Sequence, residues 1–193
     1  MSLDSKLFVE AFAFAVDLHK NQLRKGTKIP YISHLMGVSA LVLEAGSDTD
    51  QTIAALLHDA VEDQGGMKVL AEIKEQFGER VASIVEGCSD SFSKPKPPWK
   101  ARKEQYLDHL PGSTPDVRLV SLADKLHNAR SILQDLKSNG PGVFNKFNGG
   151  LKGTLWYYNK LVEIFKMTDS GFLIDELTIV VKEISEIASE DGD

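Results

Sequence analysis

Residues 56–63 read Leu56-Leu57-His58-Asp59-Ala60-Val61-Glu62-Asp63, which places four polar side chains in an otherwise apolar segment. The segment continues a helical pattern that follows the cap-rich run 47–51, so we expect one helix over residues 53–62. On such a helix His58 and Glu62 stand one turn apart, as do Asp59 and Asp63. Burying these groups without partners is costly, so the stretch predicts either a metal site or a surface location.

The same helical spacing of apolar residues extends over almost the whole chain, and no strict alternation is long enough to predict a strand. We therefore predict an all-α fold. The expected helices span residues 4–23, 30–46, 53–62, 68–77, 79–88, 99–110, 114–140, 151–167 and 172–188. The proline-rich run 89–98 predicts an exposed loop, and the Gly- and Asn-rich segment 140–153 a mobile one. A chain of 193 residues, 42% of them hydrophobic, can bury one full-sized core, so we expect a single domain over residues 1–193.

Composition excludes several classes of function. The chain has 22 basic and 28 acidic residues and a formal charge of −6, which argues against broad binding to nucleic acid or to an anionic membrane. Residues 1–5 lack the layout of a signal peptide and no apolar run is long enough to span a membrane, so a cytoplasmic protein is expected. The one cysteine, Cys88, can form neither an internal disulfide nor a cysteine-rich metal site. Any metal would therefore be held by histidine and carboxylate.

Two further segments combine an apolar helical face with a polar group: His34 follows residues 30–33, and Asp124 lies within residues 120–128. If the three helices pack together, His34, His58, Asp59 and Asp124 can surround one divalent ion and leave positions open for water or substrate. Each residue alone has an ordinary explanation, such as a core histidine or an exposed ion pair between Asp124 and Lys125. Their occurrence together, in this order, favours the metal site.

Four motifs carry a resemblance to a known family. They are Arg24 with the PYISH of residues 30–34, the LLHDAVED of residues 56–63, the FGERV of residues 77–81 with the VEG of residues 85–87, and the ADKLHN of residues 123–128. The chain resembles the HD superfamily of metal-dependent phosphohydrolases, and within it the hydrolase domain of the RelA/SpoT family and the stand-alone, Mesh1-like small alarmone hydrolases. The motif-bearing core covers roughly residues 5–136, with further helices over about 151–190.

The resemblance implies a single-domain HD-type helical bundle and a set of site residues. His34, His58, Asp59 and Asp124 would bind one divalent ion, with Mn2+ expected in this branch. Glu62 and Asp63 would assist catalysis, and Arg24, Lys25 and Asn128 would line the substrate pocket. The tyrosine that relatives place near the nucleotide is open between Tyr157, Tyr158 and neither. Leu35 follows the first histidine where proline is common, and the turn before Pro30 is longer than in many relatives.

The family reaction is hydrolysis of the 3′-diphosphate of guanosine tetra- or pentaphosphate (ppGpp or pppGpp), releasing pyrophosphate and GDP or GTP. The expected protein is thus an alarmone hydrolase of the stringent response, with a small-molecule nucleotide as its partner and a homo-oligomer left open. A chain of this length has no room for a synthetase domain. Two alternatives stay open: an HD nucleotidase acting on a nucleoside monophosphate or NADPH, and a non-catalytic nucleotide-binding HD protein. Pyrophosphate release would separate the alarmone hydrolase from a nucleotidase, which releases orthophosphate.

Overall fold

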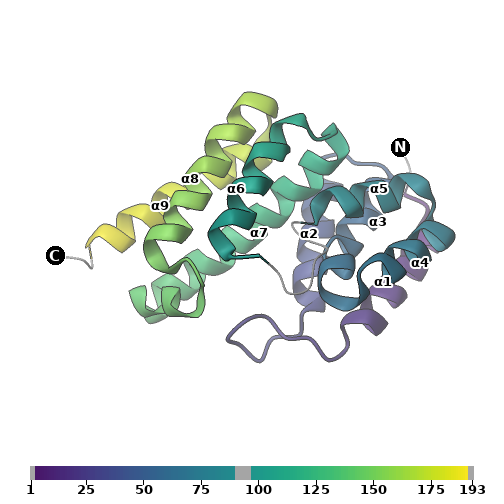
Figure 1. The fold of residues 1–193 in the computed structure, drawn as a ribbon, viewed down its shortest axis with the longest axis horizontal. Coiled ribbons are helices and arrows are strands. Elements are labelled where there is room, and N and C mark those ends of the chain that lie inside the picture. Colours follow the sequence, from purple (N-terminus) through teal and green to yellow (C-terminus); the bar gives the residue numbers. More distant parts are fainter. Residues whose placement is uncertain (1–2, 90–96, 191–193) are drawn as a thin grey trace. The chain divides into compact units, whose positions relative to one another are not determined.

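The computed structural model describes residues 3–89 and 97–190 of the chain, and the regular elements in these ranges are all helical (Figure 1). The α-helices are α1 (Ser5–His19), α2 (Ile32–Glu44), α3 (Thr49–Leu57), α4 (Met67–Phe77), α5 (Glu79–Cys88), α6 (Trp99–His109), α7 (Pro115–Asn139), α8 (Gly150–Thr168) and α9 (Phe172–Glu190). Within the same ranges, β-pairing is confined to an isolated bridge between Leu23 and Pro30. The all-α prediction is confirmed. In these residues no helix has both the length and the apolar character needed to cross a membrane.

The chain divides into two compact units, and the boundary falls inside α7, between Ala123 and Asp124. The described part of the first unit is residues 3–89 and 113–123, with α1 to α5 and the start of α7. The second unit holds residues 97–112 and 124–190, with α6, the remainder of α7, α8 and α9. The single domain expected over residues 1–193 stays a prediction.

Helix α3 forms the centre of the first unit, where it packs against α1, α2 and α5. All of its residues from Thr52 to Leu57 are buried, because the helix is apolar on every side and has neighbours around it. A capping box begins the helix: the Asp48 side chain accepts a hydrogen bond from the Gln51 backbone, and the Gln51 side chain accepts one from the Asp48 backbone. The cap and the burial together determine where α3 starts and how it is oriented in this unit.

The prediction of one helix over residues 53–62 is wrong at its end. Helix α3 stops at Leu57, His58 and Asp59 form a turn, and a π-helical segment, η1, follows over Val61–Gly65. The Gly66 N–H donates to the Val61 carbonyl at 2.9 Å, which is the wider spacing of a π-helix. Gly66 has a φ of +60°, a conformation that glycine adopts without steric cost, so the chain can leave η1 abruptly and enter α4.

Two other boundaries differ from expectation. Helix α1 ends at His19 and not at Leu23, because the chain turns back on itself: the Tyr31 N–H donates to the Gln22 carbonyl and the Arg24 N–H to the Ile29 carbonyl, both at 2.9 Å. The segment 140–153, expected to be mobile, contains the 3-10 helix η3 (Pro141–Lys146) and the first turn of α8. Of the predicted loop 89–98, residues 90–96 lie outside the described part of the chain.

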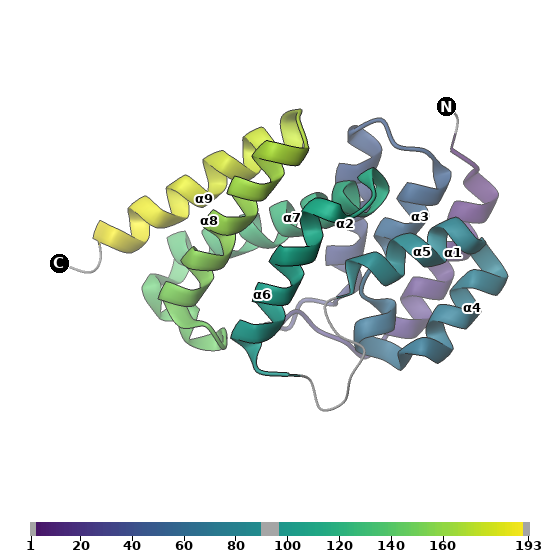
Figure 2. The ribbon, with the colours of Figure 1, turned by 45° about the horizontal axis from the view of Figure 1, so that its top comes forward.

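In the second unit α8 packs against α6, α9 and η3 (Figure 2). The Trp99 ring of α6 lies directly on the backbone of α8 and of the turn before it. A Cβ added to Gly149 would approach Trp99 Cη2 to 2.6 Å, and one added to Gly153 would approach it to 3.1 Å. The two glycines therefore allow α6 and α8 to pack closely.

Candidate metal centre

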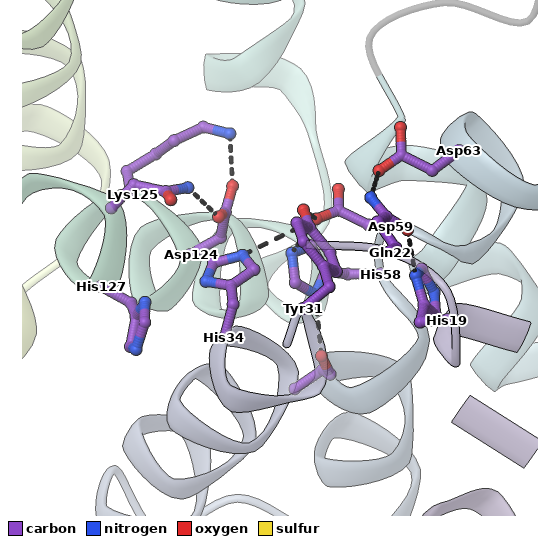
Figure 3. Close-up of polar contacts among 12 residues, drawn as sticks. His19, Gln22, Tyr31, His34, His58, Asp59, Asp63, Asp124, Lys125 and His127 are labelled. Atoms are coloured by element: carbon purple, nitrogen blue, oxygen red, sulfur yellow. Dashed lines mark hydrogen bonds and ion pairs between the residues drawn. The ribbon is translucent and has the colours of Figure 1, made fainter. Parts of the chain in front are cut away.

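His34, His58 and Asp59 form a cluster in the first unit (Figure 3). His34 lies in the first turn of α2, and His58 and Asp59 immediately follow the buried helix α3. Each residue offers one ligand atom, and these atoms all lie within 4.8 Å of one another. Asp59 Oδ2 is 3.1 Å from His58 Nε2 and 3.7 Å from His34 Nε2. Three residues that the sequence predicted as metal ligands are thus brought together.

The hydrogen bonding of His58 indicates that this cluster is suited to a cation. His58 Nδ1 lies 2.8 Å from the carbonyl oxygen of Ala55, which can only accept, so Nδ1 carries the proton. Nε2, the other ring nitrogen, faces an Asp59 carboxylate oxygen in a site where His58 is only 3% exposed. This contact is favourable when a positive charge, either a ring proton or a metal ion, is present there. The backbone carbonyl thus selects the tautomer that presents Nε2 to a metal.

Tyr31 supports the cluster, a role that was not predicted from the sequence. Its hydroxyl donates to Asp59 Oδ2 at 2.5 Å, and its ring meets the His34 ring edge-on with centroids 5.4 Å apart. The Arg24 guanidinium lies on the same ring, 5.8 Å from its centroid. The spacing of Tyr31, three residues before His34 at the start of a helix, could have indicated that the two share a face.

The acidic pair lies on the π-helical segment that follows the cluster. Glu62 is half-buried, whereas Asp63 is exposed and accepts a hydrogen bond from Gln22 Nε2 at 2.8 Å. The Asp63 N–H donates to the Asp59 carbonyl at 3.0 Å, so these two residues keep the one-turn relation that the sequence predicted. Lys25 lies exposed in the turn between α1 and α2, beside the half-buried Arg24.

Asp124 and Asn128 lie in the part of α7 that belongs to the second unit. Asp124 is 6% exposed, and its carboxylate accepts hydrogen bonds from Asn128 Nδ2 and Lys125 Nζ, each at 2.5 Å. Burial acts to lower the pKa of Lys125, but the Asp124 carboxylate opposes this strongly enough that the pKa lies well above its usual value. Lys125 is therefore a half-buried cation that neutralises Asp124.

Both tyrosines considered as nucleotide contacts, Tyr157 and Tyr158, are buried in the second unit. Burial raises the pKa of Tyr157 well above its usual value, so its hydroxyl stays protonated. Lys103 Nζ lies 5.0 Å from the centroid of the Tyr157 ring. These contacts leave the choice between the two tyrosines open.

Comparison with known proteins identifies a family and several relatives to which this chain is similar. The sequence profile of the HD domain matches residues 11–154. The guanosine-3′,5′-bis(diphosphate) 3′-pyrophosphohydrolase MESH1 of Xenopus tropicalis is 42% identical over 135 residues, which are 68% of this chain and 73% of that protein. The Homo sapiens protein of the same name is 37% identical, with the same coverage.

A solved structure has a similar fold over nearly the whole chain. It is described as a metazoan ortholog of SpoT that hydrolyzes ppGpp and plays a role in starvation responses. The TM-score is 0.77 at 28% sequence identity, and the match covers 95% of this chain and 98% of that one.

Proposed function

Because this chain belongs to the HD-domain family, we propose that it is a metal-dependent phosphohydrolase that removes the 3′-diphosphate of ppGpp or pppGpp. The products are pyrophosphate and GDP or GTP. The observation that carries the proposal is the cluster of the buried His34 and His58 with the half-buried Asp59, in which two imidazole nitrogens face one carboxylate. The choice of substrate is supported by the pyrophosphohydrolases that are 37–42% identical to this chain.

His34, His58 and Asp59 would hold one divalent ion, and their donor set of two nitrogens and a carboxylate oxygen suits a first-row metal such as Mn2+. Asp124 is proposed as a further ligand on the basis of the ADKLHN motif. When bound, such an ion would lower the pKa of its water, so that hydroxide forms more readily near neutral pH, and would polarise a phosphoryl oxygen. Tyr31 would orient the Asp59 carboxylate through its 2.5 Å hydrogen bond.

The remaining residues would manage protons and charge. Glu62 and Asp63 follow the cluster on η1, where a carboxylate would orient the attacking water and a protonated carboxyl group would give its proton to the departing 3′-oxygen. Arg24 and Lys25 would offset the negative charge of the phosphates, in a chain that is acidic overall. Asn128 is proposed to contact the nucleotide, in addition to its hydrogen bond to Asp124. Such an enzyme would act in the cytoplasm on the alarmone pool of the stringent response.

The proposal is tested with a panel of substrates. Mn2+-loaded protein is incubated with ppGpp, GMP and NADPH, and the products are separated by ion-exchange chromatography, with orthophosphate and pyrophosphate measured in each reaction. We expect GDP and pyrophosphate in equal amounts from ppGpp. Orthophosphate from GMP or NADPH, with ppGpp left intact, would instead identify a nucleotidase. No turnover of any substrate by protein that has metal bound would favour a non-catalytic nucleotide-binding protein.

A further inference from the structure

His19, the last residue of α1, is a buried histidine to which neither the motifs nor the proposed reaction gives a role. It is 2% exposed, and burial lowers the pKa of its imidazole, so the ring is neutral near pH 7. A neutral imidazole has one N–H donor. His19 Nδ1 lies 2.6 Å from Gln22 Oε1, an acceptor, which places the proton on Nδ1.

Gln22 also contacts Asp63, one member of the acidic pair. While its oxygen accepts from His19, its amide nitrogen donates to Asp63 Oδ2 at 2.8 Å (Figure 3). The Asp63 carboxylate can only accept, so the Gln22 nitrogen faces Asp63 and the Gln22 oxygen faces His19. Gln64 Nε2 lies beside the same Gln22 oxygen and 3.3 Å from His19 Nδ1. If the amide flipped, its NH2 group would face the His19 N–H and the Gln64 donor, and its oxygen would face the Asp63 carboxylate. The His19 proton thus selects the orientation that holds Asp63.

The His19 ring also contacts Tyr31, which is hydrogen-bonded to the metal cluster. His19 and Tyr31 stack with ring centroids 5.4 Å apart and an interplanar angle of 18°. The Tyr31 hydroxyl donates to Asp59. One imidazole therefore contacts both a residue that binds Asp63 and a residue that binds Asp59, although His19 is distant in sequence from both carboxylates.

We propose that His19 is a positioning residue: its Nδ1–H orients Gln22, which holds the Asp63 carboxylate, while its ring supports Tyr31 against Asp59. The inference rests on the proposed function for the role of Asp63, but the contacts that carry it do not depend on the substrate. A histidine kept only for packing would not need a hydrogen-bond donor on Nδ1, since an apolar ring of similar size would fill the same space.

Two variants of His19 separate its two contacts. His19→Phe keeps a ring to stack on Tyr31 but removes the donor to Gln22. His19→Asn places an amide N–H near the position of Nδ1 but removes the ring. We expect His19→Phe to lower kcat for ppGpp about tenfold with little change in KM or in Mn2+ affinity. His19→Asn should recover most of the kcat but weaken Mn2+ binding, because the ring that supports Tyr31 is lost. His109→Phe, which replaces an exposed histidine of α6, is the matched control and should keep the wild-type kcat.

A double variant tests whether His19 acts through Asp63. If it does, His19→Phe combined with Asp63→Ala should be no slower than Asp63→Ala alone, because the contact is already lost. If the two losses multiply, or if His19→Phe keeps the wild-type kcat, the positioning role is wrong. A merely structural role would lower the melting temperature and leave the two losses independent.

A measurement without substrate keeps this inference separate from the proposed function. The Gln22 side-chain amide resonances, followed by NMR, should shift when Asp63 is replaced by Ala, and should shift similarly in His19→Phe. Unchanged Gln22 resonances in His19→Phe would overturn the inference even if the wild-type enzyme hydrolyses ppGpp. Conversely, if both variants shift the Gln22 resonances but the wild-type protein leaves ppGpp intact, the proposed substrate is wrong and the positioning role stands.

Discussion

At the scale of single residues, the Asp59 carboxylate is the group on which the contacts of the candidate metal centre converge. Its Oδ2 atom lies within 3.7 Å of two imidazole nitrogens and accepts the Tyr31 hydroxyl at 2.5 Å. A carboxylate that binds a metal is oriented by the hydrogen bonds it accepts, and loss of such a bond weakens metal binding. We therefore expect Tyr31 to affect the affinity for the metal without being a metal ligand itself.

Replacing Tyr31 by Phe should weaken Mn2+ binding about tenfold, because Asp59 loses a donor while the ring that packs on His34 is kept. The measurement is the free Mn2+ signal in electron paramagnetic resonance during a titration of the apoprotein. Tyr157→Phe, which removes a buried hydroxyl from the second unit, serves as the control and should bind Mn2+ as the wild type does. Equal affinities in wild type and Tyr31→Phe would show that the hydroxyl does not orient the ligand.

The sequence predicted some residues of this centre and missed others. His34, His58 and Asp59 could be found because each is a metal-ligating residue within a motif of recognisable spacing. Spacing could have placed Tyr31 beside His34. The contacts of Tyr31 with Asp59 and with His19 could not be predicted, because they depend on how the turn between α1 and α2 folds back onto the end of α3. That turn is held by backbone hydrogen bonds, such as the one from the Tyr31 N–H to the Gln22 carbonyl, which leave no mark in the side-chain pattern.

At the scale of elements, the position of α3 determines where His58 and Asp59 project. The helix begins at a capping box on Asp48, whose carboxylate also pairs with Arg80 of α5 at 2.6 Å. Burial acts to raise the pKa of Asp48, but the hydrogen bonds from the Gln51 backbone and from Arg80 outweigh it and hold the pKa below its usual value. The ionised form is thus favoured in the folded state.

Asp48→Ala should lower the free energy of unfolding at pH 7 by about 1 kcal/mol, the usual effect of losing an N-cap. Because the folded-state pKa is depressed, this stabilisation is present above the unfolded pKa of about 4 and is lost as the pH falls through the lower folded value. Urea unfolding at a series of pH values should give a difference between wild type and variant that shrinks below about pH 4. Asp17→Ala, an exposed acid of α1, is the control; a difference independent of pH would contradict the assignment.

The helix boundaries also show which ends of helices the sequence could predict and which it could not. The caps and glycines placed α4 and α5 within a residue of the structure, because Gly66 and Gly78 stop a helix locally. The end of α3 was wrong by five residues, since the apolar and polar pattern of residues 58–62 fits an α-helix as well as a turn followed by a π-helix. Only the packing of the turn decides between them, and periodicity does not report it.

At the scale of the whole molecule, metal binding should appear as added stability. An ion that binds the folded state and not the unfolded chain stabilises by about 2.7 kcal/mol when it is present at 100 times its Kd. For a chain of this size, each kcal/mol corresponds to a rise of about 2–4 °C in Tm. Mn2+ should therefore raise the Tm of the wild type by several degrees in a calorimetric scan and leave that of Asp59→Ala unchanged. The same rise in the variant would place the ion elsewhere.

The most direct test of the account is to follow ppGpp hydrolysis while the apoprotein is titrated with Mn2+, with Asp59→Ala run in parallel. We predict that pyrophosphate release rises with metal occupancy, saturates at one ion per chain and is absent from the variant at every metal concentration. Hydrolysis that is independent of added metal after chelation, or that persists in Asp59→Ala, would contradict the assignment of His34, His58 and Asp59 as the catalytic metal centre.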